Sequence, residues 1–85
     1  MNKAREVLER ALVIGERTYG RDHANVASTL SSLGTVYSEL GDANKARELL
    51  ERALIIRERM YGADHAKVAP TLASLGSAYD DWGDA

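Results

Sequence analysis

The sequence predicts an all-α protein built from a repeated pair of helices. Shifting the chain against itself by 42 residues aligns 2–43 with 44–85, and 29 of the 42 aligned pairs are identical. Within each copy, apolar residues recur three and four positions apart, which is the spacing of one helix face. Neither copy shows the sustained alternation of apolar and polar residues that indicates strands. A period of this size is typical of stacked arrays, in which each unit buries its apolar face against a neighbour.

The composition limits the chain to one small globular domain. It has 85 residues, of which 45% are hydrophobic and 28% charged, and no cysteine. The net charge of −2 provides no broad basic surface, so we expect no nucleic-acid partner. The sequence contains neither an apolar run of about 20 residues nor a secretory leader, so we expect no membrane partner and a cytoplasmic location.

The first helix of each copy is expected over 2–19 and 43–61. In the second copy its apolar stripe consists of Ala46, Leu49, Leu50, Ala53, Leu54 and Ile56. Charged residues between them, such as Glu48 and Arg52, lie three to four positions apart, and we interpret them as a solvated face. A glycine follows the last turn in each copy, where a residue of positive φ commonly ends a helix.

The second helix of each copy is expected over 23–40 and 65–82. In the first copy its apolar stripe consists of Val26, Leu30, Leu33, Gly34, Tyr37 and Leu40. Connections of only a few residues predict that neighbouring helices are antiparallel. Aspartates that stand just before the helices are predicted to be their N-caps: Asp22, Asp64, Asp42 and Asp84.

Three kinds of residue carry expectations about packing. Gly34 and its counterpart Gly76 lie in mid-helix, where glycine costs about 1 kcal/mol relative to alanine unless the space is needed. We therefore expect a side chain of a partner helix against each glycine. Tyr37 and Tyr79 are expected to fill the wider end of the helix pair, with the hydroxyl at a polar edge. Pro70 falls in the second turn of its helix, so this helix either starts late or bends.

The stretch TLSSLGTVYSELGDANKARELLERAL resembles the tetratricopeptide repeat. The residues on the signature positions of that family are Leu30, Leu33, Gly34, Tyr37, Gly41, Ala46, Leu50 and Ala53. The period of 42 residues, with YGRDHANVASTL and YGADHAKVAPTL, is similar to the longer variant found in kinesin light chains. The resemblance covers the whole chain. It implies a right-handed α-solenoid of antiparallel helix hairpins, and a non-catalytic scaffold for protein interactions.

In that family each unit pairs a helix A with the helix B that follows, so this chain, a single array over 1–85, runs B-A-B-A. Its one complete A–B repeat is about 23–61. Both ends then lack a partner helix and are predicted to expose apolar residues: Val7, Leu8 and Leu12 at one end, and Leu75, Tyr79 and Trp82 at the other. Because these ends are complementary, we expect head-to-tail association with a second copy; a closed dimer and a monomer are the alternatives. This phase of the repeat favours a piece of a longer array or an engineered chain.

The resemblance also implies that helix A lines a concave groove. The matching positions are Ser28, Ser31, Thr35, Ser38 and Glu39 in the first copy and Pro70, Ala73, Ser77, Asp80 and Asp81 in the second. All five pairs differ between the copies, whereas only eight of the remaining 37 pairs do. The carboxylates make this groove mildly acidic, so its expected ligand is a short extended peptide with Lys or Arg. The alternative is that two units are too few to hold a peptide.

No arrangement of residues predicts an enzyme. His23 and His65 occupy equivalent places 42 residues apart, with no further ligands at short spacing, so no metal site is expected. They are interpreted as polar residues at helix starts. Asp22, His23 and Ser28 lack the spacing of a catalytic triad, and the glycines form no phosphate-binding loop. We therefore expect no catalytic residues and no cofactor.

Overall fold

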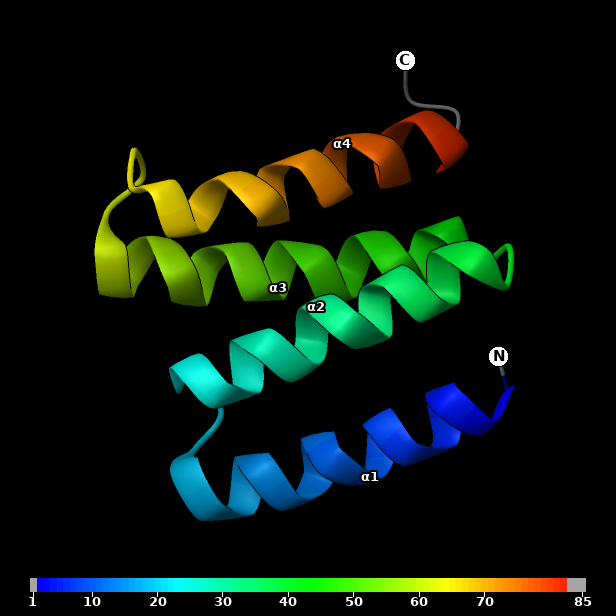
Figure 1. Ribbon diagram of the computed structural model, residues 1–85, viewed down its shortest axis with the longest axis horizontal. Helices are drawn as coiled ribbons and strands as arrows, with labels where there is room; N and C mark the ends of the chain where they lie inside the picture. Colours follow the sequence, from blue (N-terminus) through cyan, green and yellow to red (C-terminus); the bar gives the residue numbers. More distant parts are fainter. Residues whose placement is uncertain (1, 83–85) are drawn as a thin grey trace.

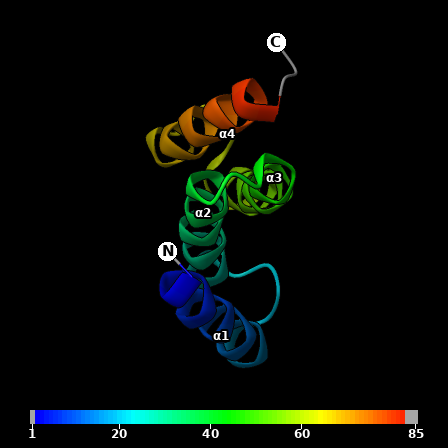
Figure 2. The same cartoon turned by 90° about the vertical axis from the view of Figure 1, so that its right-hand side faces the viewer.

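The computed structural model describes residues 2–82; Met1, residues 83–85 and the side chains of Asp81 and Trp82 lie outside the described part. Its elements are α1 (Asn2–Tyr19), α2 (Ala24–Glu39), α3 (Ala43–Tyr61), the 3-10 turn η1 (Ala66–Val68) and α4 (Ala69–Trp82). Consecutive helices run in opposite directions (Figure 1). Figure 2 shows α1 and α4 at opposite ends of the stack, with α2 and α3 between them. The all-α class and the four predicted helices are confirmed.

None of the helices in the described part combines the length and apolar character needed to cross a bilayer.

The caps that precede α2 and η1 lie one residue later than predicted. The N-cap of α2 is His23, whose Nδ1 accepts a hydrogen bond from the Asn25 N–H at 3.1 Å. His65 caps η1 in the same way, so the prediction that Asp22 and Asp64 are caps is wrong. The ring of Tyr19 stacks on His23 with centroids 4.7 Å apart, and this contact holds the imidazole at the helix start.

The cap of the central B helix agrees with the sequence. Asp42 precedes α3, and its Oδ1 accepts a hydrogen bond from the Lys45 N–H at 3.1 Å. The equivalent prediction for Asp84 lies outside the described residues. Gly62 ends α3 with φ +92°, a conformation that favours glycine, and its N–H donates to the Glu58 carbonyl.

The helix that contains Pro70 starts later than its predicted first residue, 65. The chain forms the turn η1 first, and α4 begins only at Ala69, so Pro70 is the second residue of α4. In the first turn of a helix the missing N–H of proline breaks no intrahelical hydrogen bond. Of the two possibilities that the sequence left open, the structure has the late start.

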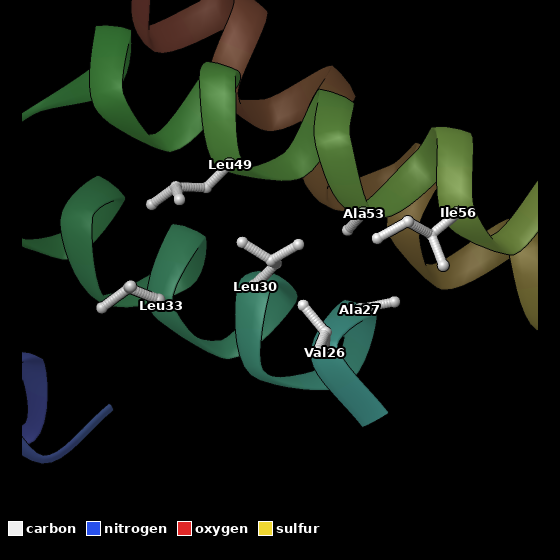
Figure 3. Packing of buried hydrophobic residues seen from close by; sticks show 7 residues of the cluster. All are labelled: Val26, Ala27, Leu30, Leu33, Leu49, Ala53 and Ile56. Carbon is white, nitrogen blue, oxygen red and sulfur yellow. The ribbon is translucent and has the colours of Figure 1, made fainter. Parts of the chain in front are cut away.

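The core is the interface of α2 and α3, whose mutual contact is the most extensive of the molecule. Figure 3 shows its apolar side chains interlocking between the two helices. The buried members of this cluster are Val26, Ala27, Leu30 and Leu33 of α2 and Leu49, Ala53 and Ile56 of α3. A second, smaller cluster joins α3 to α4: Ala46, Leu50, Leu75 and Ala78. The core therefore sits on the complete A–B pair, and α1 and α4 are attached to its two sides.

Gly34 permits the close approach of α2 to α3. A Cβ atom at this position would lie 2.8 Å from Leu50 Cγ and 3.4 Å from the Ala46 carbonyl oxygen. The expected partner side chain is therefore present at Gly34. At Gly76 the same expectation is wrong, because no described residue lies within 4 Å of the equivalent Cβ position.

The two glycines should respond oppositely to alanine. Gly34→Ala forces Leu50 to move within a packed core, and we expect it to lower the free energy of unfolding by about 1–3 kcal/mol. Gly76→Ala meets no neighbour and gains helix propensity, so we expect a rise of up to about 1 kcal/mol. Urea unfolding at low protein concentration measures both changes, and equal effects of the two variants would contradict this account of Gly34.

Candidate interaction surfaces

The two copies use the same polar contact to join each A helix to the B helix before it. The Tyr37 hydroxyl of α2 donates a hydrogen bond to Glu9 Oε2 of α1 at 2.8 Å. Tyr79 of α4 makes the equivalent bond to Glu51 of α3. The predicted placement of both tyrosine hydroxyls at a polar edge is confirmed. The bond to Glu9, followed by burial, raises the pKa of the Tyr37 phenol, because both stabilise its neutral form.

Arg52 joins successive B helices. Its Nη2 donates to the Glu16 carboxylate of α1 and to the Arg21 carbonyl oxygen, the latter at 3.2 Å. The interpretation of Arg52 as part of a solvated face with Glu48 is therefore wrong. The repeat places Arg10 and Glu58 at the equivalent positions, and within residues 2–82 neither forms an ion pair. Among the described residues, Arg10 on α1 and Glu58 on α3 are thus the two halves of a second such link, each without the other.

The outer side of α1 is an apolar surface that no other element of the described residues covers. We define the α1 face as Val7, Ala11 and Ile14. Val7 is 61% exposed, whereas its equivalent Leu49 is 8% exposed; Ile14 is 56% exposed, whereas its equivalent Ile56 is 1% exposed. The difference arises because α3 has an A helix on this side and α1 has none. Val7 therefore lies where the sequence placed it, on the open end.

Two other residues predicted at this end face inward. Leu8 and Leu12 are half-buried and pack against the α2–α3 core cluster. They anchor α1 to the molecule, and the prediction that they form the exposed edge is wrong in this respect. Ile14 was missed. Its counterpart Ile56 lies on the predicted apolar stripe of α3, so the alignment of the two copies could have identified Ile14.

The outer side of α4 is the complementary surface. We define the α4 face as Ala69, Leu72 and Gly76, all exposed. Leu72 is 47% exposed, whereas its equivalent Leu30 in α2 is completely buried. Leu75 points the other way, into the α3–α4 cluster at 5% exposure, so its predicted place on the open end is wrong. Tyr79 is half-buried against the same cluster, and the Trp82 side chain lies outside the described part.

Two hollows lie along the groove between α2 and α4, with α3 as their floor. The first has a volume of about 190 Å³ and lies toward the C-terminal ends of α2 and α4. Four of the predicted groove residues line it: Thr35, Ser38, Glu39 and Ser77. Leu50 and Ser74 complete its wall. Glu39 gives this hollow the acidic character that the sequence predicts.

The second hollow, of about 340 Å³, lies at the other end of the groove and carries the opposite charge. The predicted residues Ser28 and Pro70 line it, together with Arg57 and Lys67, which the prediction missed. The prediction of a mildly acidic groove therefore holds for the first hollow and is wrong for the second, which Arg57 and Lys67 make basic. Both basic residues differ from their counterparts in the first copy, Gly15 and Asn25, and this difference was the available signal.

The remaining predicted groove residues line neither hollow. Ser31 is half-buried within α2, while Ala73 and Asp80 are exposed on α4. The Asp81 side chain lies outside the described part. The structure thus brings together six of the ten predicted positions, in two separate groups.

Among the described residues, no three His, Asp or Glu side chains lie close enough together to hold a metal ion. His23 and His65 each use Nδ1 to accept the capping hydrogen bond described above. Their predicted role as polar residues at helix starts is confirmed.

Arg57 is the structural centre of the second hollow. Its guanidinium donates to Thr71 Oγ1 of α4 at 2.7 Å and to Ser28 Oγ of α2 at 3.3 Å. Thr71 is almost fully buried, so it depends on this donor for a hydrogen bond. Arg57 thereby connects the two A helices across the B helix between them.

We expect Arg57→Met to lower the free energy of unfolding by about 1–3 kcal/mol, because it keeps the aliphatic stem but leaves the Thr71 hydroxyl buried without its donor. Arg59→Met is the matched control: its contact with Asp22, at 3.9 Å, is exposed, so its loss should cost less than about 1 kcal/mol. Urea unfolding compares the two variants. Equal losses would contradict a structural role of the Arg57 bridge.

Comparison with known proteins agrees with this architecture. A family model described as tetratricopeptide repeat matches residues 1–59 and 36–85, which together span the chain. No curated protein matches the sequence. The similarity to the longer variant of kinesin light chains stays a prediction. Repeats of the matched family generally mediate protein–protein interactions and are non-catalytic scaffolds. The chain therefore belongs to the tetratricopeptide repeat family.

Proposed function

We propose that this chain is a non-catalytic interaction scaffold whose partner is a second copy of itself, joined head to tail through the α1 face and the α4 face. The observation that carries the proposal is the contrast in exposure between equivalent residues. Val7, Ile14 and Leu72 are about half exposed or more, while Leu49, Ile56 and Leu30 are buried in the α2–α3 interface.

The two faces have the same chemistry as the two sides of an interface that already exists in the molecule. The α1 face corresponds to the α3 side of the core, and the α4 face corresponds to its α2 side. Burying an aliphatic side chain of this size stabilises an interface by about 1.5–3 kcal/mol relative to leaving it in water. Residues that interlock inside the chain therefore supply a favourable contact when α4 of one copy meets α1 of the next.

A closed dimer is the competing arrangement. In it, two α1 faces or two α4 faces would meet about a twofold axis. Such a contact buries apolar surface as well. However, it places like surfaces together and has no counterpart inside the chain, whereas the head-to-tail contact is a copy of the α2–α3 packing. We therefore favour head-to-tail association.

Self-association is tested by light scattering over a dilution series from about 1 µM to about 1 mM. We expect the average mass to rise with concentration, and Ile14→Arg to keep the chain monomeric, because it places a charge in the α1 face. Val13→Arg is the control: Val13 is exposed, and so is its equivalent Ile55 on the internal helix, so this variant should associate normally. A wild-type chain that stays strictly monomeric throughout would refute the proposal.

A second candidate function rests on the groove. We propose that the acidic hollow takes a Lys or Arg side chain of an extended peptide, because Glu39 lines it among small hydroxyl residues. The basic side chains of Arg57 and Lys67 at the other hollow favour an acidic group there. A peptide that carries a basic residue and an acidic residue some distance apart therefore fits this surface better than a uniformly basic one.

The groove is tested by calorimetric titration with a peptide of this mixed charge and with a uniformly basic peptide. We expect the mixed peptide to bind more tightly, and Glu39→Gln to weaken binding about threefold, as expected for a partly solvated charge pair. Glu48→Gln removes the same charge from a residue that lines neither hollow, and should have no effect. No heat from either peptide would exclude this second function.

A further inference from the structure

We infer that the head-to-tail junction is locked in one register, in which Leu8 of the second copy seats against Gly76 and Arg10 of that copy pairs with Glu58. This inference rests on the proposed self-association and specifies its partner surface residue by residue. It also assigns a direction to the assembly, because the two sides of the junction are different surfaces. The seat at Gly76, the ion pair and the matched differences between the copies support it.

The first support is the space at Gly76. Within one chain, the Leu50 side chain of α3 occupies the space beside Gly34 of α2, where its Cγ would be 2.8 Å from an added Cβ. The repeat equivalents of these two residues are Gly76 and Leu8. Gly76 is exposed, and no described residue lies within 4 Å of its Cβ position, although glycine in mid-helix costs about 1 kcal/mol relative to alanine. Leu8 is only half-buried. The open space beside Gly76 and the leucine that would fill it, Leu8, thus lie on the first and last helices of one chain.

The second support is the open ion pair. Arg52 reaches Glu16 and the Arg21 carbonyl oxygen across the internal B–B contact. A shift by one repeat replaces this set with Arg10 of the second copy, Glu58 and the carbonyl oxygen of Ala63. Arg10 borders the hollow of about 250 Å³ over the α1 face, so this residue lies beside the apolar contact. The pair therefore complements the apolar packing in the same register.

The third support is a matched difference between the copies. Inside the chain, Arg57 of α3 bonds Ser28 of α2. At the junction the equivalent positions are Gly15 of the second copy and Pro70. At the junction the residue that lacks the guanidinium therefore meets the residue that lacks the hydroxyl, so neither half of the Arg57–Ser28 hydrogen bond recurs there without its partner. Two of the 13 differences between the copies compensate each other across the proposed contact.

This register makes the assembly heterologous, so each copy of a pair keeps one free face, α1 or α4, to which a further copy can add. The direction is tested with two blocked variants. Ile14→Arg blocks the α1 face, and Leu72→Arg blocks the α4 face; both positions are exposed in the single chain, so folding is retained. We expect each variant alone to be monomeric, and an equimolar mixture to form a 1:1 dimer that grows no further, as measured by sedimentation.

The possible failures are distinguishable. A wild-type chain that never associates refutes the proposed function itself. Association of Leu72→Arg alone indicates a closed contact between α1 faces, and association of Ile14→Arg alone a contact between α4 faces. Either result overturns the direction inferred here while self-association stands.

The register is tested within the same mixture. Gly76→Ala, added to the Ile14→Arg partner, should weaken the heterodimer about tenfold, because its methyl group meets Leu8 as a Cβ at Gly34 would meet Leu50. Glu48→Ala alters an exposed residue of α3 outside the α4 face and should leave the affinity unchanged. Arg10→Glu should weaken the dimer about threefold, and Glu58→Arg on the other partner should restore it. An unchanged affinity with Gly76→Ala overturns the register.

Discussion

The close approach of α2 to α3 at Gly34 is the constraint on which the rest of the structure depends. With no Cβ on Gly34, Leu50 lies directly against the backbone of α2, and the aliphatic residues on both sides interlock into one buried cluster. Protein cores are packed densely enough that a single added methyl group is felt by its neighbours. This contact sets the spacing of the central pair, and α1 and α4 then attach to its two sides through Leu8, Leu12, Leu75 and Ala78.

The same constraint explains why the ends of the stack keep the chemistry of its interior. Because the second copy repeats the first, the residues that interlock at the centre recur at α1 and α4. There they meet water instead of a partner helix. Leu30 and Leu72 illustrate this: the same side chain at the same repeat position is buried in α2 and half exposed in α4. The difference lies entirely in what packs beside the helix.

Several differences between the copies lie in the groove between α2 and α4, which residues of both copies line. Arg57 in place of Gly15 adds a guanidinium that bridges two A helices, and Lys67 in place of Asn25 adds a second positive charge beside it. Glu39 lies at the other end of the groove. The groove is therefore acidic at one end and basic at the other, although the net charge of the chain is small.

The sequence by itself determined the repeat, the helix class, the approximate helix bounds, the contact at Gly34 and the direction of the tyrosine hydroxyls. The repeat and the helices follow from local periodicity. The contact at Gly34 follows because a glycine in mid-helix is unfavourable unless a neighbouring side chain needs the space. Only the tertiary structure decided which apolar residues face outward. Leu72 and Leu75 lie on one broad apolar stripe, which in a stack packs against a helix on each side. The stripe alone does not show which of its residues face the helix that is present and which face water. Likewise, Arg52 lies on a charged face in sequence, but its partner Glu16 is 36 residues away, and only the packing of both α1 and α3 against α2 brings the two charges together.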